Sequence, residues 1–157
     1  MLQLINLKDQ PQHIESLAHW HHSEWSHFNP DENIAQRVTR MQTYLNDNFI
    51  PSTYIAFDKE LLGSAAIVKN DMDSKPELSP WLASVYVNSE HRNKGIGKKL
   101  VEHLMHQAQL NDIDKLYLLT PDQKKFYQRL GWQSISDEKY HGSDVTVMQI
   151  SLNNSSL

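Results

Sequence analysis

The stretch Trp-Leu-Ala-Ser-Val-Tyr-Val at residues 81–87, followed by Asn-Ser-Glu-His-Arg-Asn-Lys-Gly-Ile-Gly-Lys-Lys-Leu at 88–100, decides the fold of this chain. The first part is a dense apolar run of strand length, and the second passes through a polar turn into a helical pattern that ends near Asn111. Gly95 and Gly97 stand where the helix begins, and glycine has no side chain to obstruct an approaching ligand. Because free N–H groups at a helix start favour an anion, the turn predicts a pyrophosphate site.

Two other phosphate-binding loops do not fit this glycine turn. A Walker A loop ends in Gly-Lys-Ser or Gly-Lys-Thr, whereas this sequence continues Gly97-Lys98-Lys99. A dinucleotide-binding fingerprint needs a third glycine, and Val101 stands where that glycine would fall. The simplest alternative is that the two glycines only start a helix, and the turn alone does not decide between this reading and a pyrophosphate site.

Outward from the turn, hydrophobic periodicity predicts an α/β chain with the element order βααβββαβαββ. Helices are expected over residues 11–23, 30–46, 95–111 and 121–130, and strands over 2–7, 53–58, 61–69, 81–87, 115–119, 133–137 and 145–152. The core face of the third helix is expected to comprise Ile96, Leu100, Leu104 and Ala108. A tight turn at 58–60 joins two strands, and Gly63 marks a bulge. The polar segment 153–156 is expected to fray.

The composition is typical of one globular domain over residues 1–157, with 39% hydrophobic and 22% charged residues. The chain has no cysteine, which excludes disulfides and a cysteine nucleophile. A formal net charge of −4 argues against a nucleic-acid partner. Neither a membrane-spanning run of about 20 apolar residues nor an export leader is present, so we expect a cytoplasmic protein without a membrane partner.

The segment Arg92-Asn93-Lys94-Gly95-Ile96-Gly97, with the strand before it, resembles the pyrophosphate motif of the GNAT acetyltransferases. Residues 125–132, Lys-Phe-Tyr-Gln-Arg-Leu-Gly-Trp, resemble the second cofactor motif of that family. More narrowly, residues 80–87 and 120–122 resemble a bacterial subgroup related to the actin N-terminal acetyltransferase. The resemblance implies a mixed, largely antiparallel sheet that splays after its fourth strand and is flanked by helices.

The resemblance also implies that acetyl-CoA, the acetyl donor, lies where the sheet splays, and that no metal is required. Backbone N–H groups along the fourth strand would polarise the thioester carbonyl, as in an oxyanion hole. Arg92 has a second possible role, which is to order the turn. The cofactor-binding residues expected on this basis are Val85, Tyr86, Val87, Arg92, Asn93, Lys94, Gly95, Ile96, Gly97, Lys98, Phe126 and Tyr127.

In the family motif, the tyrosine equivalent to Tyr127 lies beside the sulfur, so Tyr127 is the expected proton donor to the departing thiolate. Its helical spacing with Phe126 fits plain core packing as well. The attacking amine must be neutral, and Glu24, Glu77, Tyr86 and Ser84 are the candidate bases, acting directly or through water. Glu24 and Tyr86 join Tyr127 as the predicted catalytic residues.

The stretch His19-Trp20-His21-His22 with Glu24 has the spacing of a possible metal site, but we expect no metal, and packing is the simplest alternative. Tryptophans offer flat walls for a cation. The predicted acceptor-binding residues are Trp20, Glu24, Trp81 and Ser84. The predicted function is N-acetylation of a small amine such as a polyamine, an aralkylamine or an aminoglycoside. The alternatives are a protein or peptide acetyltransferase and a non-catalytic acyl-CoA sensor, in either case a monomer or a homodimer.

Overall fold

The computed structural model describes residues 1–152, so the tail at 153–156, where we expected fraying, lies outside the described residues. Within that range the chain follows the predicted order βααβββαβαββ. The strands are β1 (Gln3–Asn6), β2 (Ser52–Asp58), β3 (Glu60–Val68), β4 (Trp81–Val87), β5 (Lys115–Thr120), β6 (Gln133–Tyr140) and β7 (Ser143–Ser151). The helices are α1 (Ile14–Trp25), α2 (Ile34–Gln42), α3 (Ile96–Leu110) and α4 (Lys124–Arg129), and short 3₁₀ turns lie between them.

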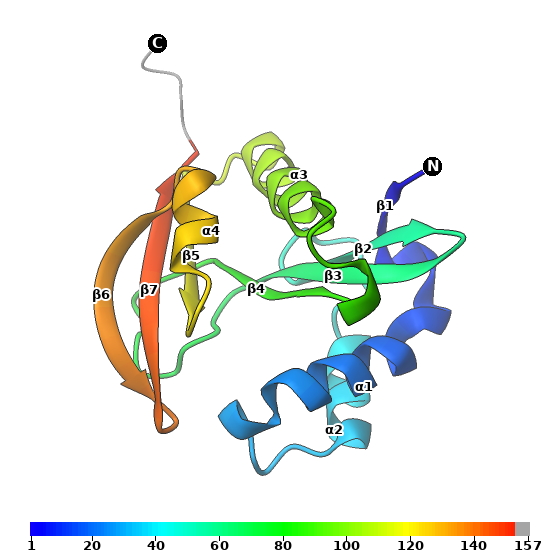
Figure 1. Cartoon of the computed structure of the whole chain (residues 1–157), viewed down its shortest axis with the longest axis horizontal. Coiled ribbons are helices and arrows are strands. Elements are labelled where there is room, and N and C mark those ends of the chain that lie inside the picture. Colours follow the sequence, from blue (N-terminus) through cyan, green and yellow to red (C-terminus); the bar gives the residue numbers. More distant parts are fainter. Residues whose placement is uncertain (153–157) are drawn as a thin grey trace.

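One sheet holds these strands in the order β1-β2-β3-β4-β5-β7-β6 (Figure 1). Neighbouring strands are antiparallel except β4 and β5, which are parallel. These two strands pair only at Trp81 and Tyr117, so they separate toward the end of β4. The predicted mixed, largely antiparallel sheet is therefore confirmed, and the segment 85–87 pairs with β3 on one side only.

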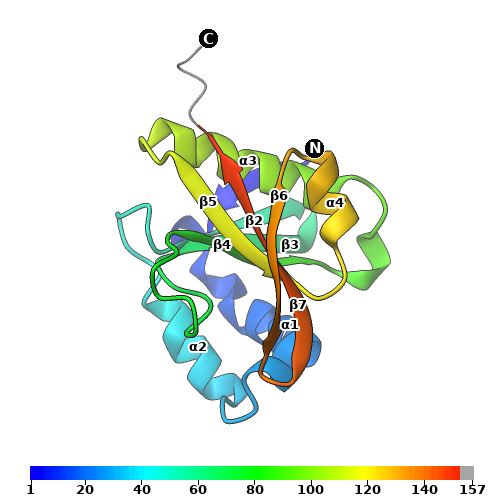
Figure 2. The same cartoon turned by 90° about the vertical axis from the view of Figure 1, so that its left-hand side faces the viewer.

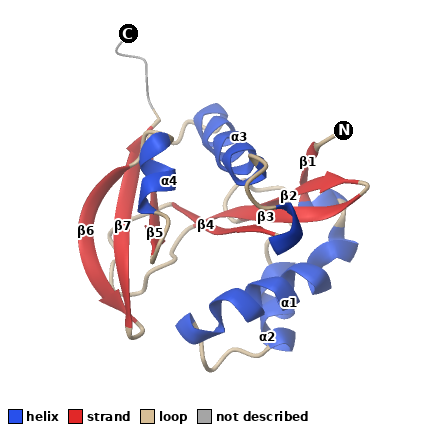
Figure 3. Cartoon of the chain, viewed as in Figure 1, coloured by secondary structure: helices blue, strands red, loops and turns tan. Residues whose placement is uncertain are grey.

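Helices cover both faces of the half of the sheet that contains β1 to β4 (Figures 1 and 3). Helix α3 packs on β2, β3 and β4, and α1 and α2 pack against each other on the opposite face. The predicted core face of α3 is confirmed, because Ile96, Leu100, Leu104 and Ala108 are all buried. Seen from the side, β5, β6 and β7 cross the direction of β2 to β4 steeply (Figure 2). This change of direction within the sheet accompanies the separation of β4 from β5.

Several element boundaries differ from the sequence-based expectation. Helix α2 ends at Gln42 rather than at residue 46, α4 begins at Lys124 rather than at residue 121, and β6 continues to Tyr140 rather than to residue 137. The first helix begins with a 3₁₀ turn at Pro11–His13 and continues as α1 to Trp25. The second begins at Ile34 rather than at residue 30, because Asn33 and Gln36 form a capping box in which each side chain accepts the other residue's backbone N–H. Among residues 1–152, the helices fall short of the length and apolar character needed to cross a bilayer.

The hairpin between β2 and β3 contains the expected irregularity near Gly63. Ala56 pairs with Gly63 and Phe57 with Leu61, so one extra residue of β3 bulges between these pairs. A Cβ atom at Gly63 would collide with the backbone oxygen of Tyr86 on β4. Only glycine therefore allows β3 to approach the end of β4 this closely, beside Tyr86 and Val87, where β4 has no pairing with β5.

Candidate active site

A cleft of about 1040 Å³ opens where β4 and β5 separate. Its walls come from the end of α1, from α2, from the loop at 70–73, from β4, from the glycine turn and from the β5–α4 connection. All the predicted cofactor-binding residues line it except Lys94. Tyr127, Glu24, Tyr86 and Ser84 line it as well, whereas Trp20, Glu77 and Trp81 do not.

The glycine turn presents free backbone N–H groups to this cleft. Gly95 is the N-cap of α3 with a φ of 81°, in the left-handed region that favours glycine, and it has no side chain to cap the helix. The first amides of the 15-residue helix α3 are therefore available to an anion. A Cβ atom at Gly97 would meet Val87 Cγ2 at 3.6 Å and Phe126 Cζ at 3.7 Å, so a small group fits there but a large one does not.

Arg92 ties this turn to the end of β4 and to α1. Its Nε donates a hydrogen bond of 2.8 Å to the carbonyl oxygen of Val87, and its guanidinium lies 5.3 Å from the centre of the Tyr86 ring. The Nη2 atom is 3.4 Å from Glu24 Oε1, and both side chains are partly exposed. These contacts fit the turn-ordering role for Arg92, and they tie the end of α1 to the end of β4.

A bulge lies in β4 on the cleft side of the sheet. Ser64 pairs with Tyr86 and Ala66 with Ala83, so β4 carries an extra residue there, and Ser84 has a φ of 54°. The Ser64 hydroxyl donates a 3.0 Å hydrogen bond to the carbonyl oxygen of Ser84. The bulge interrupts the regular pairing just before the unpaired edge of β4.

The buried His21 of α1 contacts the bulge indirectly, through the Ser64 hydroxyl. Its Nε2 lies 2.8 Å from Ser64 Oγ, and because that hydroxyl gives its proton to Ser84, Nε2 must carry the proton and donate. His21 is 1% exposed, and burial, helped by the charges of Arg37 and Arg40, lowers its pKa well below the usual value. His21 is therefore neutral and fixed in one tautomer, and it acts on β4 through Ser64.

Tyr127 reaches the cleft from α4. It is 7% exposed and packs at ring-centre distances of 4.9 Å from Phe126 and 6.0 Å from Trp132. Burial raises the pKa of its phenol above the usual value, and the negative charge of Asp122 adds to this effect. The side chain thus combines the packing role with a hydroxyl that stays protonated at neutral pH.

The other end of the cleft has aromatic walls that differ in part from those predicted. Trp25, Phe28 and Tyr140 line it. Trp20 instead stacks on Tyr86 at 5.6 Å outside the cleft. Trp81 is fully buried and donates its Nε1–H to the carbonyl oxygen of Leu78 at 2.7 Å. Its burial argues against the predicted contact between Trp81 and an acceptor.

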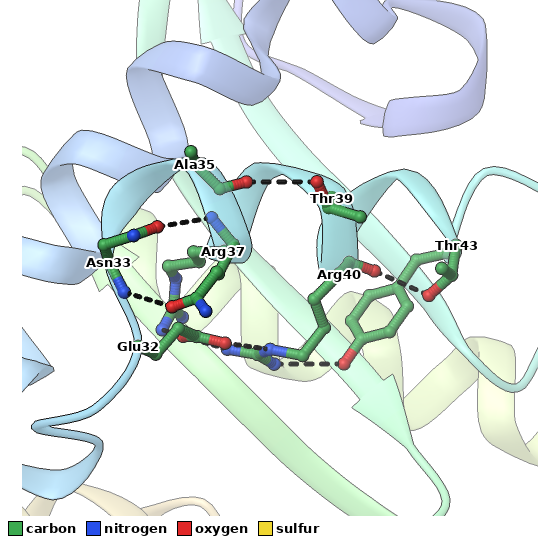
Figure 4. Close-up of polar contacts among 9 residues, drawn as sticks. Glu32, Asn33, Ala35, Arg37, Thr39, Arg40 and Thr43 are labelled. Carbon is green, nitrogen blue, oxygen red and sulfur yellow. Dashed lines mark hydrogen bonds and ion pairs between the residues drawn. The ribbon is translucent and has the colours of Figure 1, made fainter.

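Two arginines and a glutamate at this end were not predicted. Glu32 accepts two hydrogen bonds from Arg40, at 2.8 Å from Nε and 2.9 Å from Nη2 (Figure 4). Arg37 is 6% exposed, and its Nη1 lies 3.5 Å from Glu32 Oε1. A sequence signal existed, because Arg37 lies three residues after Ile34 and four before Met41, a spacing that puts it on the same helix face as these two apolar residues.

Asp71 and Asp73 add carboxylates from the loop that follows β3. Asp71 has exposed surface, yet loss of hydration within the cleft raises its pKa to about 7, against the opposing effect of Arg40 and Arg37. Among residues 1–152, no three His, Asp or Glu side chains gather in a way that would hold a metal ion. His19 and His22 accordingly do not form the core of such a group.

Comparison with known proteins places the chain in a family. The model of the acetyltransferase (GNAT) family matches residues 14–132. Over 75 residues the chain is 28% identical to a spermine/spermidine N(1)-acetyltransferase of Bacillus subtilis (strain 168), an alignment that covers 45% of this chain and 49% of that protein. The chain thus spans about half the length of the curated relatives it matches.

Solved structures share the fold over nearly the whole chain. An N-acetyltransferase from Staphylococcus aureus Mu50 matches with a TM-score of 0.76 at 13% identity, covering 98% of this chain and 99% of that one. An aminoglycoside 6'-N-acetyltransferase in complex with coenzyme A has a TM-score of 0.73 at 15% identity, covering 98% of this chain and 97% of that one. A protein from Salmonella typhimurium described as an acetyltransferase, with acetyl-CoA bound, has a TM-score of 0.71 at 14% identity, covering 98% and 95%. The narrower resemblance to the actin N-terminal acetyltransferase stays a prediction.

Proposed function

This chain belongs to the acetyltransferase (GNAT) family, and we propose that it transfers an acetyl group from acetyl-CoA to a primary amine of a small molecule. The observation that carries the proposal is the glycine turn at the unpaired end of β4, with Tyr127 lining the same cleft. The relatives named for spermine and spermidine and the structural neighbour named for aminoglycosides support a small amine as the acceptor class.

The residues present fit acetyl-CoA as the donor. The uncapped amides at the start of α3 suit its pyrophosphate, and Lys98 adds positive charge beside them. The one-sided edge of β4 from Val85 to Val87 offers backbone groups to its pantetheine arm. The bulge at Ser84 lies at the start of this edge, where N–H groups would polarise the thioester carbonyl.

The reaction requires two proton transfers. As the amine nitrogen forms its bond to the acetyl carbon, the bond from that carbon to sulfur breaks, and the thiolate takes a proton from the Tyr127 hydroxyl. The base takes the proton that the amine loses, and this proton returns to Tyr127 through water, so the net reaction yields the amide and the free CoA thiol. The amine must arrive neutral, which at pH 7 costs roughly 5 kcal/mol for a group of pKa ~10.4 and about 1 kcal/mol for an α-amine near 8. We propose Glu24 as the base, beside Tyr86 and Arg92. Asp71, whose pKa of about 7 suits this task, is the second candidate.

Acetyl-CoA binding tests this function most directly. We expect calorimetry to show binding by the wild-type protein, retention of binding in Gly97→Ala and loss in Gly97→Trp, with all three folded by circular dichroism. Release of free CoA thiol with a panel of small amines then measures turnover. A wild-type protein without affinity for acetyl-CoA contradicts the proposal, and binding without turnover of any amine indicates a sensor instead.

A further inference from the structure

Arg37 is a buried cation at the aromatic end of the cleft, and its side chain makes no hydrogen bond within the described part of the chain. It is 6% exposed, and its Nε is buried without a hydrogen-bond partner among residues 1–152. Burial, together with the charge of Arg40, lowers its pKa to about 10, so the side chain remains cationic at neutral pH. A buried guanidinium in this state calls for an anionic partner, because burying an uncompensated charge is costly.

The neighbouring carboxylate of Glu32 is not a full hydrogen-bonding partner for Arg37. Glu32 gives both of its oxygens to Arg40 in hydrogen bonds of 2.8 and 2.9 Å, and Arg37 approaches it only to 3.5 Å, without a hydrogen bond. Two guanidinium groups therefore share one carboxylate (Figure 4). Asp71 lines the same cleft but makes no ion pair with either arginine within 4.0 Å in the described part of the chain.

The position of Arg37 suits contact with an acceptor. Its guanidinium carbon lies 6.0 Å from the centre of the Trp25 ring, and Trp25 packs edge-on against Tyr86 of β4 at 5.9 Å. One aromatic ring therefore separates Arg37 from the strand that is expected to hold the thioester. Arg37, Trp25 and Tyr86 all line the same cleft.

We propose that the acceptor amine also carries a carboxylate, which Arg37 binds, so that the acceptor is amino-acid-like rather than a polyamine. This inference rests on the proposed function and narrows its acceptor class. Arginine is the side chain best suited to a carboxylate, because its donors match the two oxygens. Asp71 and Asp73 at the same end would favour the ammonium group, so the cleft carries charges of both signs for a zwitterion. The carboxylate comes either from a free amino acid or from an acidic residue beside the α-amine of a short peptide.

Matched acceptors test the proposal on the wild-type protein. The first set is an aromatic L-amino acid, its amide and its decarboxylated amine, and the second is a C-terminally amidated tripeptide that begins with Asp and its Asn counterpart, with spermidine as the polyamine. Binding to the CoA-loaded protein and kcat/KM per neutral amine are both measured. We expect the carboxylate-bearing member of at least one set to exceed its neutral partner tenfold or more, and the set that responds identifies the source.

Variants then assign the preference to Arg37. In Arg37→Met we expect the advantage of the carboxylate to vanish through KM while acetyl-CoA affinity stays within twofold, and Arg37→Lys should restore part of it. Arg129→Met removes an exposed arginine of α4 and should change nothing. If Arg37→Met does not fold, the wild-type comparison and Arg37→Lys decide. Equal use of neutral and carboxylate-bearing partners, a preference for spermidine, or a preference that survives in Arg37→Met overturns the inference. A wild-type protein that does not bind acetyl-CoA would overturn the proposed function, and this result is distinct from the outcomes that test Arg37.

Discussion

At the scale of single residues, Tyr127 shows how a packing position can also serve chemistry. The same burial that places the ring against Phe126 and Trp132 raises the pKa of its phenol, so the hydroxyl is protonated at any pH at which an amine acceptor reacts. Because its pKa is raised, Tyr127 does not lose its proton as the pH is increased, and it therefore does not cause a fall in activity at alkaline pH. The residue therefore cannot remove a proton from the amine, and its hydroxyl is available as a hydrogen-bond donor to the departing thiolate. Because a raised pKa makes the phenol a weaker acid, proton transfer to sulfur depends on prompt return of a proton to Tyr127.

We expect Tyr127→Phe to lower kcat by roughly 10²-fold, the lower end of the range for general acid catalysis, because the thiolate then takes its proton from water. Acetyl-CoA affinity and melting temperature should change little, since the ring remains. Steady-state kinetics with the best acceptor measure the effect, and Tyr54→Phe, a tyrosine on β2 outside the cleft, is the control. An unchanged kcat in Tyr127→Phe would leave Tyr127 with a packing role only.

Substitution of Glu24 tests whether this residue is the base that deprotonates the acceptor amine. Its replacement by Gln keeps the size of the side chain and a partner for Arg92 but removes the carboxylate, so kcat should fall roughly 10²-fold with an amine of high pKa and less with an α-amine. Rates across pH 6 to 10 measure this, with Asp71→Asn measured in parallel. A loss confined to Asp71→Asn would move the base to that residue, and its rate profile should then follow a group of pKa about 7.

At the scale of elements, β4 owes its shape to contacts on both sides. Two consecutive hydrogen bonds, from His21 to Ser64 and from Ser64 to the carbonyl oxygen of Ser84, connect α1 to the bulge. On the β3 side, Gly63 permits the strand to lie close to Tyr86. Ser64→Ala removes the hydroxyl that links them. We expect kcat to fall about tenfold, the effect of roughly 1.4 kcal/mol for one lost hydrogen bond, with acetyl-CoA affinity nearly unchanged.

Ser52→Ala is the matched control for Ser64→Ala. Ser52 is equally buried in β2, but its hydroxyl has no partner among residues 1–152. Both variants remove one buried hydroxyl from neighbouring strands, and only one touches β4. Equal kcat values for the two would mean that the link to Ser84 has no influence on the reaction.

Gly63→Ala tests the close approach of the strands. Its Cβ atom would collide with the backbone oxygen of Tyr86, so β4 must shift or the pair must separate. We expect a loss of about 1–3 kcal/mol in unfolding free energy, as for other overpacked sites, together with weaker acetyl-CoA binding. Denaturant unfolding and calorimetry measure the two effects. Gly142→Ala is the comparison: its Cβ has open space, but a φ of 83° strains the backbone, so this variant should also lose stability while keeping acetyl-CoA affinity. An equal loss of acetyl-CoA affinity there would argue against a local effect on β4.

The sequence predicted elements better than their contacts. The apolar spacing of β4 and α3 correctly placed these two elements on either side of the glycine turn, because each follows from a pattern of neighbouring residues. The start of α2 was misplaced at residue 30, whereas the Asn33 to Gln36 capping box sets it at Ile34. The bulge at Ser84 depends on Ser64 and His21, which lie 20 and 63 positions away, and no local pattern reports such a contact.

At the scale of the whole molecule, the cleft joins a donor half encoded in one stretch to an acceptor half assembled from distant segments. Residues of α1, α2, the loop at 70–73 and β6 meet there only after folding. Sequence reasoning accordingly placed Gly97 and Tyr127 in the cleft but missed Arg37 and placed Trp81 there although it belongs to the core. Specificity is therefore the property that most needs the structure.

Stability of the whole fold should depend on pH through His21, which joins α1 to the sheet. Burial lowers its folded-state pKa well below 6.5, whereas in the unfolded chain it takes up a proton near that value. Below pH 6.5 the unfolded state therefore binds more protons, so stability is fully present above pH 6.5 and declines as the pH falls toward the folded pKa. The slope attributable to one group is at most about 1.4 kcal/mol per pH unit. Urea unfolding between pH 7.5 and 5.0 measures it.

His21→Gln removes this titration while its amide keeps a donor toward Ser64. We expect the variant to be less stable than the wild type at pH 7.5, because its packing beside Trp25 and Tyr86 is lost, and to show a flatter decline below pH 6.5. His106→Gln, an exposed position on α3, should retain the wild-type slope. Two other groups also titrate differently on folding in this range: Asp71, whose raised pKa of about 7 adds stability as the pH falls, and His103, whose lowered pKa removes it. The difference in slope between the wild type and His21→Gln therefore measures the contribution of His21, whereas the wild-type slope alone does not. If the unfolding free energies of His21→Gln and the wild type decline with the same slope, protonation of His21 does not cause the pH dependence of stability.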